Sequence, residues 1–138
     1  RWCEKKFGKF NSLLLLQPTT PFRSLRVLKN ALRQFKKNKG KKNYVSISKN
    51  NSLSKNMLIG KTTKNAEVKL TKIKRKKDFN NLTNKFYLNG SFYIISPKEI
   101  KQTKSFLTKN SMGIQILKKK EMIDIDTKTD LKLARGFK

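Results

Sequence analysis

The stretch SLLLLQPTTPFRSLRVLKNALRQFKKNKGKKNYVSIS, residues 12–48, decides the fold class. Residues 12–17 contain a continuous apolar run, which is typical of a strand buried on both faces at the centre of an α/β sheet. Residues 25–40 carry a helical pattern, and residues 43–48 alternate as a second strand. A strand, a helix and a strand in this order predict a βαβ unit with a parallel, right-handed crossover.

The helix over residues 25–40 is predicted from its apolar spacing and from its two ends. Ser24 is placed to cap the N-terminus, and Gly40 follows a lysine-rich turn where the helix would end. Apolar side chains recur every three or four residues, so they form one stripe along the helix. This stripe consists of Leu25, Leu28, Leu32 and Phe35.

Further strand and helix signals follow along the chain. Pro97 comes directly after an aromatic strand and marks a helix start, and Thr127 with Asp130 forms a capping-box pattern before the last helix. A length of 138 residues suits one domain. Alternating or β-branched runs predict strands at 56–60, 66–73, 90–96, 113–117 and 122–126.

Basic residues dominate the composition. The chain has 35 Lys and Arg against 8 Asp and Glu, and its net charge is +27. Such a charge is typical of proteins that bind nucleic acid. Few of these residues are Arg, however, and abundant Lys, Asn and Ile also follow from an AT-rich genome. Two interpretations stay open: a binding surface, or a mutational bias spread over a solvated surface.

The composition also excludes several classes of site. The single cysteine, Cys3, excludes an intrachain disulfide framework and fits a reducing compartment, so we expect a cytoplasmic protein. Without any His, the chain has no ligand set for zinc. The longest apolar run is four residues, which is too short to span a membrane.

Four of the eight acids fall in EMIDIDTKTD, residues 121–130. On a strand, Asp124 and Asp126 would share one face while Ile123 and Ile125 share the other. Two carboxylates held side by side favour a hard divalent cation such as Mg²⁺, bound together with substrate phosphates. A bare D-x-D is more often a pair of solvated side chains, and the pattern alone favours that interpretation.

Two other segments place polar groups beside predicted strands. Gln17 and Thr19 lie where the first predicted strand ends, and the ligands of open α/β sheets bind at that edge. Asn89 and Gly90 form a turn pair at the start of an aromatic strand. For each segment taken alone, a plain turn or a packed core is the simpler interpretation.

In this order and at these separations, three segments resemble the acylneuraminate cytidylyltransferase family, which includes CMP-N-acetylneuraminic acid synthetases and related nonulosonic acid cytidylyltransferases. That family has a Leu-rich strand running into Q-P-T-S-P-x-R, then an N-G-A-x-Y strand, then an I-D-I-D-T segment. The match covers most of residues 10–48 and 86–136, and residues 49–85 are only loosely similar. The three segments are LLLLQPTTPFRS (13–24), YLNGSFYI (87–94) and IDIDTKTDLKLA (123–134).

The resemblance implies an α/β, Rossmann-like nucleotide-diphosphosugar transferase fold with a mixed, mostly parallel sheet. It also implies a reaction of sialic acid biosynthesis, in which CMP passes from CTP to a sialic-acid-like nine-carbon sugar acid and pyrophosphate is released. Residues 49–85 would form a dimerisation or lid segment, and we expect a homodimer.

The site residues implied by the resemblance fall in the three quoted segments. Asp124 and Asp126 would be the catalytic pair that holds Mg²⁺ against the triphosphate. Arg23 would organise the turn rather than touch substrate. The pocket for the sugar acid would be lined by Gln17, Thr19, Asn89 and Tyr93.

The chain also departs from the family. The family begins with a strand and a basic, Gly-rich segment that cradles the CTP phosphates, and these 138 residues contain no counterpart. We therefore expect the C-terminal portion of the domain, without its N-terminal strands, and little or no transferase activity from this fragment alone. Thr20, Tyr87 and Lys128 stand where the family usually has Ser, Arg and an acid. With Tyr87, a contact to the sugar carboxylate would be either lost or supplied by another residue.

A small basic nucleic-acid-binding protein is the alternative from another class, and a decayed pseudoenzyme is a third interpretation. The nucleic-acid alternative rests on charge alone, because the basic residues are scattered and the aromatic residues fall in predicted strands. We therefore do not expect nucleic acid to be the partner.

Overall fold

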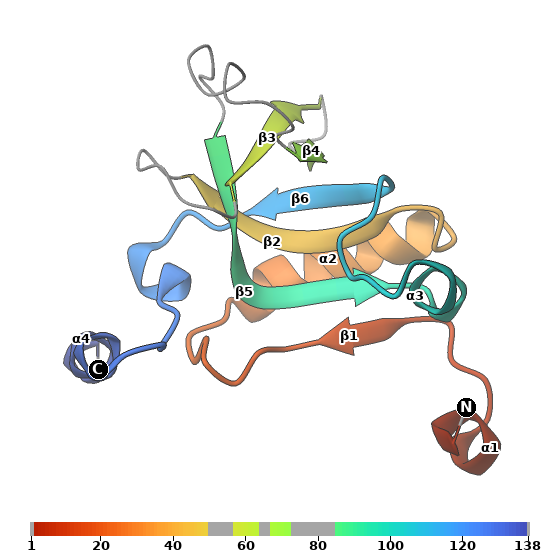
Figure 1. Ribbon diagram of the computed structural model, residues 1–138, viewed down its shortest axis with the longest axis horizontal. Coiled ribbons are helices and arrows are strands. Elements are labelled where there is room, and N and C mark those ends of the chain that lie inside the picture. The colour runs from red at the N-terminus through yellow and green to blue at the C-terminus, as the bar shows by residue number, and fades with distance from the viewer. Residues whose placement is uncertain (1, 50–56, 64–66, 73–84, 138) are drawn as a thin grey trace.

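The computed structural model describes residues 2–49, 57–63, 67–72 and 85–137. The elements, in chain order, are α1 (Trp2–Phe7), β1 (Leu13–Leu15), α2 (Leu25–Lys37), β2 (Asn43–Lys49), β3 (Met57–Thr62), β4 (Glu67–Lys72), β5 (Lys85–Ile95), α3 (Pro97–Thr103), β6 (Ser111–Gln115), the 3-10 helix η2 (Lys119–Met122) and α4 (Lys128–Gly136). α2 packs along one face of a six-stranded sheet, while α1 and α4 stand away from the sheet near opposite ends (Figure 1).

Helix α2 forms where its apolar spacing predicts it. The Ser24 hydroxyl accepts a hydrogen bond from the Val27 N–H at 3.4 Å and caps the N-terminus, as predicted. The helix ends at Lys37, earlier than the predicted Gly40. Leu25 is 68% exposed, so the predicted stripe fails at its first position. The side chains that α2 buries are Leu28, Ala31 and Phe35.

The sheet is mostly antiparallel, so the predicted mostly parallel sheet is wrong. Its strand order is β1-β5-β2-β6-β4-β3, and of the described pairings β2–β6 is parallel while the others are antiparallel. β1 and β2 do run in the same direction, as a crossover through α2 requires. They are not neighbours, because the 11-residue strand β5 lies between them and pairs with both.

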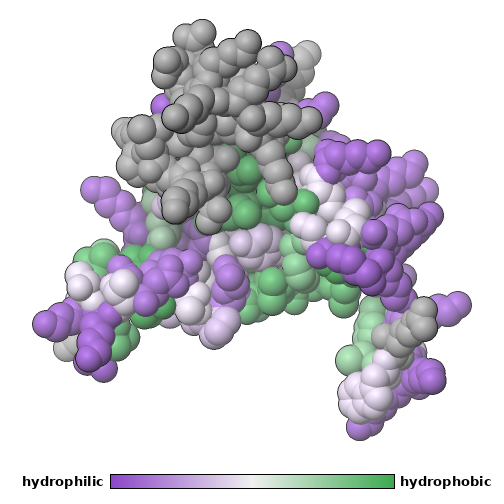
Figure 2. Space-filling model, viewed as in Figure 1, coloured by the Kyte–Doolittle hydropathy of each residue, from purple (hydrophilic) through white to green (hydrophobic). Residues whose placement is uncertain are grey.

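β1 lies at the border of the sheet rather than at its centre. Leu14, Leu15 and Leu16 are 41%, 37% and 41% exposed, and hydrophobic surface follows this border of the sheet (Figure 2). The predicted strand buried on both faces is therefore wrong. Among the described residues only β5 pairs with β1, and no further strand covers its other edge.

Five of the strands close into a ring. β5 pairs with β2, β2 with β6, β6 with β4, and β4 with β3, and β3 pairs again with the first part of β5. The two paired parts of β5 are separated by an irregular segment, because Val45 faces Tyr93 whereas Ile47 faces Leu88. Gly90 lies in this segment with φ of +73°, a conformation that favours glycine.

The core has one part on each face of the sheet. Alternation along β2 directs Tyr44 to the α2 face and Val45 and Ile47 to the interior of the ring. The α2 face also holds Phe92. Phe86 fills the ring and is fully buried, so aromatic side chains anchor both parts.

The C-terminal part of the chain departs from one predicted strand. Residues 122–126 form no strand: η2 ends at Met122, and the following residues have no regular structure. The predicted strands at 56–60, 66–73, 90–96 and 113–117 correspond to β3, β4, β5 and β6, while the predicted end positions 56, 66 and 73 lie outside the described residues. In the described part of the chain, no helix has the length and apolar character needed to cross a bilayer.

Candidate functional site

The turn after β1 is fixed against the irregular segment of β5. The fully buried Thr20 places its hydroxyl 3.0 Å from the Gln17 carbonyl oxygen and 3.2 Å from the Gly90 carbonyl oxygen. Arg23 donates to the Ser91 carbonyl oxygen at 2.9 Å, to the Thr20 hydroxyl at 2.9 Å, and to the Gln17 carbonyl oxygen. Arg23 therefore organises this turn, as the resemblance implied.

The side chain of Gln17 lies directly over Gly90. A Cβ atom at position 90 would collide with Gln17 Oε1 and approach the Thr20 methyl group at 3.2 Å. The absence of a side chain at position 90 thus makes room for the Gln17 amide. The turn pair Asn89-Gly90 and the Gln-Pro-Thr turn, 70 residues apart in the chain, meet here in space.

The segment carrying the two predicted metal ligands docks onto the same turn. The Ile125 N–H donates to the Thr19 carbonyl oxygen at 2.8 Å, and Ile123 is buried. This hydrogen bond replaces the strand pairing that the alternation of residues 122–126 predicted. It brings Asp124 beside the turn that begins at Gln17.

Asp124 and Tyr93 lie close enough to interact electrostatically. Burial raises the pKa of the Tyr93 phenol, and the negative charge of Asp124 raises it further. The Tyr93 ring also packs edge-on against Phe106, with ring centroids 5.8 Å apart. Tyr93, Asp124 and the turn residues Gln17 and Thr19 are therefore gathered in one place.

One carboxylate oxygen of Asp124 has a property expected of a metal ligand. Its Oδ1 atom is buried and has no hydrogen-bond partner among the described residues, which is unusual because buried polar atoms are nearly always paired. Asp126, by contrast, is exposed, so the two carboxylates do not share the one environment that a strand would give them. No cluster of three or more His, Cys, Asp or Glu suited to a metal occurs in the described residues.

Asn89 is buried and its amide is already engaged. Its Nδ2 group donates to the Ser48 hydroxyl at 2.8 Å, and its Oδ1 accepts from the Ser91 N–H at 3.2 Å. These bonds hold the irregular segment of β5, a structural role that the sequence did not reveal. Ser48 shares the face of β2 that carries Tyr44, and this two-residue spacing was the available signal for its burial.

The other acids of residues 121–130 have structural roles. Thr127 and Asp130 form the predicted capping box of α4, with the Thr127 N–H 2.8 Å from Asp130 Oδ2. These hydrogen bonds lower the pKa of Asp130. Glu121 lies 4.0 Å from the Lys118 ammonium. The acidic cluster thus divides into a cap, an ion pair between Glu121 and Lys118, and the two candidate ligands.

Comparison with known proteins supports the motif-based resemblance. No family model matches the chain. The chain is similar to the CMP-N,N'-diacetyllegionaminic acid synthase of Legionella pneumophila, with 34% identity over 125 residues. The alignment takes in 91% of this chain and 53% of the relative, so the chain spans about half the length of that protein. The resemblance to nonulosonic acid cytidylyltransferases is thereby confirmed.

Proposed function

We propose that the chain takes part in CMP transfer from CTP to a nonulosonic acid. The similarity over 91% of the chain carries this proposal. In the reaction, a hydroxyl oxygen of the sugar acid forms a bond to the α-phosphorus, and the bond from that phosphorus to the bridging oxygen breaks. Pyrophosphate leaves with the bonding electrons, and the hydroxyl proton passes to a base. Positioning and charge neutralisation supply most of the catalysis in such transfers.

The assembled residues suit the sugar-acid side of this reaction. Gln17 offers an amide, which can donate and accept hydrogen bonds, next to the backbone of Thr19. The Tyr93 phenol is protonated at neutral pH, and burial raises its pKa further, so it can donate to a sugar carboxylate or hydroxyl. Asn89 would bind the sugar acid only if it exchanged its hydrogen bonds to β2 and β5 for bonds to the ligand. Its binding role stays a prediction.

Mg²⁺ fits the donor set at Asp124. A hard cation usually takes one or two protein carboxylates, together with waters and substrate phosphates. The buried, unpaired Oδ1 atom of Asp124 would supply the first ligand and Asp126 the second. When bound, the cation would neutralise charge on the triphosphate of CTP. The homodimer and the lid role of residues 49–85 also stay predictions, since much of that range lies outside the described residues.

The proposal is tested by binding and by pyrophosphate release. N-acetylneuraminic acid and N,N'-diacetyllegionaminic acid are titrated calorimetrically into the chain with CTP and Mg²⁺, and pyrophosphate is assayed in parallel. We expect at least one sugar acid to bind, and Asp124→Asn to weaken Mg²⁺-dependent binding at least about tenfold, as for loss of a charged ligand.

Glu121→Gln is the matched control, because it removes the same charge from the same segment outside the candidate site. Asp126→Asn tests the second ligand separately. If the chain neither binds a sugar acid nor releases pyrophosphate, the proposed function is contradicted. If the Asp124 and Glu121 variants lose Mg²⁺-dependent binding equally, Asp124 is not a metal ligand.

A further inference from the structure

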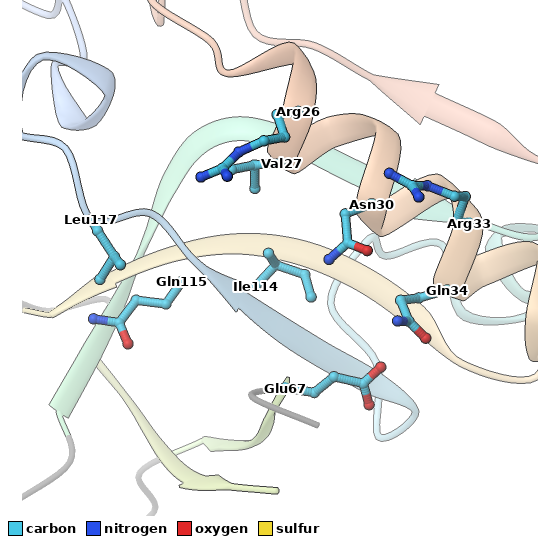
Figure 3. Close-up of a pocket in the computed structure, with 9 residues that line it drawn as sticks. All are labelled: Arg26, Val27, Asn30, Arg33, Gln34, Glu67, Ile114, Gln115 and Leu117. Carbon is cyan, nitrogen blue, oxygen red and sulfur yellow. The ribbon is translucent and has the colours of Figure 1, made fainter. Parts of the chain in front are cut away.

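A cavity lies between helix α2 and strand β6, and none of its described lining residues belongs to the candidate site. Its volume is about 570 Å³, within the usual range for small-molecule pockets. Side chains from α2 form one wall, and β4 and β6 provide the opposite side (Figure 3). The polar side chains that line it are Arg26, Asn30, Arg33, Gln34, Glu67 and Gln115.

The α2 wall presents two cations. Arg26 and Arg33 are seven residues apart, so they lie on the same side of the helix about two turns apart. Within the described residues, neither guanidinium forms an ion pair with a carboxylate. Arginine binds phosphate with two parallel hydrogen bonds, which lysine cannot do. This wall therefore suits a phosphate group.

Glu67, whose carboxylate is largely buried and held in place by the protein, lines the opposite end of the cavity. Glu67 is 3% exposed, accepts from the Tyr44 hydroxyl at 2.8 Å and lies 3.3 Å from the Lys42 ammonium. Burial and this hydrogen bond raise the pKa of Tyr44, so the phenol stays a donor. Each carboxylate oxygen keeps a second lone pair, which a ligand hydroxyl could use.

Neutral amides and aliphatic groups complete the lining. Asn30 and Gln34 on α2 face the cavity on one side, and Gln115 of β6 lies on the other (Figure 3). The apolar lining residues are Val27, Ile114 and Leu117. None of the described residues that line the cavity is aromatic, so they offer no aromatic ring on which a nucleobase could stack.

We propose that this cavity binds a phosphorylated polyol of about hexose size. Arg26 and Arg33 hold the phosphate, while the amides and the Glu67 carboxylate bond to hydroxyl groups at the other end. A nucleotide or a nucleic-acid strand fits less well, because the described lining residues include no aromatic ring and Glu67 repels an extended polyanion. The site is separate from the proposed CTP and sugar-acid site.

The proposal is tested with glucose 6-phosphate as the probe, by calorimetric titration of the full chain at one fixed ionic strength. Glucose 6-phosphate should bind more tightly than either inorganic phosphate or glucose alone. The double variant Arg26→Gln/Arg33→Gln should weaken binding at least about tenfold, the loss expected from one charge-assisted hydrogen bond. Asn30→Leu should weaken the binding of glucose 6-phosphate more than the binding of inorganic phosphate.

The matched control is Lys29→Gln/Lys37→Gln, which removes the same charge from exposed positions of α2 outside the cavity. It should change the Kd by less than about twofold. Equal weakening in both double variants, no preference over inorganic phosphate, or no binding would overturn the proposal. Displacement of the probe by a single-stranded RNA oligonucleotide, with tighter binding of the RNA, would assign the surface to a polyanion instead.

Discussion

Gly90 is the residue that joins the two motifs of the candidate site. Its φ of +73° and the Gln17 side chain above it both disfavour a larger residue. We expect Gly90→Ala to lower the free energy of unfolding by about 2–4 kcal/mol, from left-handed strain and overpacking together. Chemical denaturation measures the change.

Gly8→Ala separates the two causes. Gly8 also has positive φ, +84°, but apart from its chain neighbours no described atom lies within 4 Å of a Cβ built there. Its substitution should therefore cost only the conformational strain, about 1 kcal/mol. Equal losses at the two positions would contradict the placement of Gln17 over Gly90.

Tyr93 reports the charge of Asp124. Burial is the larger cause of its raised pKa and the charge of Asp124 the smaller, because the tyrosinate form would be poorly solvated and would lie beside a carboxylate. In Asp124→Asn the pKa of Tyr93 should fall while staying above 10, the ordinary value, since the burial remains. Titration followed by NMR of ring-labelled tyrosine measures the pKa, and Asp126→Asn is the control. An unchanged pKa in Asp124→Asn would contradict the proximity of the two groups.

At the scale of elements, the capping box makes α4 sensitive to acid. Hydrogen bonds from Thr127 hold the Asp130 pKa below 3.8, its ordinary value. A lowered folded-state pKa stabilises the helix above the ordinary pKa, and this contribution is lost as the pH falls through the folded value. Amide NMR signals of α4 should therefore show fraying as the pH is lowered below 3.8. In Asp130→Asn the first turn should fray with little dependence on pH in this range, and an identical acid response would contradict the carboxylate's role.

Local signals predicted most of these elements, and long-range pairing explains the failures. Ser24, Pro97 and Thr127 mark helix starts through chemistry confined to a few residues, and the structure confirms all three. The leucine run 13–16 has the pattern of a central strand, yet its position depends on β5, whose partners lie far away in sequence. Residues 122–126 alternate like a strand, but Ile125 bonds to the Thr19 turn instead.

The candidate site was predictable where it depends on sequence motifs, and was not predictable where it depends on long-range pairing. The order of the three motifs, through the family resemblance, predicted that Gln17, Tyr93 and Asp124 share one site. The structure brings these residues together. The burial of Asn89 was not predictable, because it depends on the pairing between β2 and β5.

At the scale of the whole molecule, the exposed edge of β1 should promote self-association. An uncovered strand edge with apolar side chains is a template for pairing with another chain, and Leu14 and Leu16 are each 41% exposed there. We expect sedimentation equilibrium to show association that the double variant Leu14→Lys/Leu16→Lys weakens at least about tenfold.

The control for this prediction is Leu25→Lys/Leu133→Lys, which adds the same charge at positions 68% and 56% exposed and outside the sheet. That variant should associate like the parent chain. If both variants dissociate equally, charge alone governs association. If neither does, the contact lies elsewhere, and a dimer through residues 49–85 becomes the interpretation to test.

The closed ring of strands also determines when the chain can fold during its synthesis. β2 pairs in parallel with β6, so Asn43 cannot pair until Ser111 has been synthesised. Likewise, β1 pairs with the second part of β5, so Leu13 cannot pair until Ile95 has been synthesised. Such distant pairings delay folding, because chain entropy is lost before the contacts form. On the ribosome, the leucines of β1 and the inner face of β2 therefore stay unpaired until most of the chain has emerged. Apolar surface that stays exposed over that interval favours aggregation of the nascent chain.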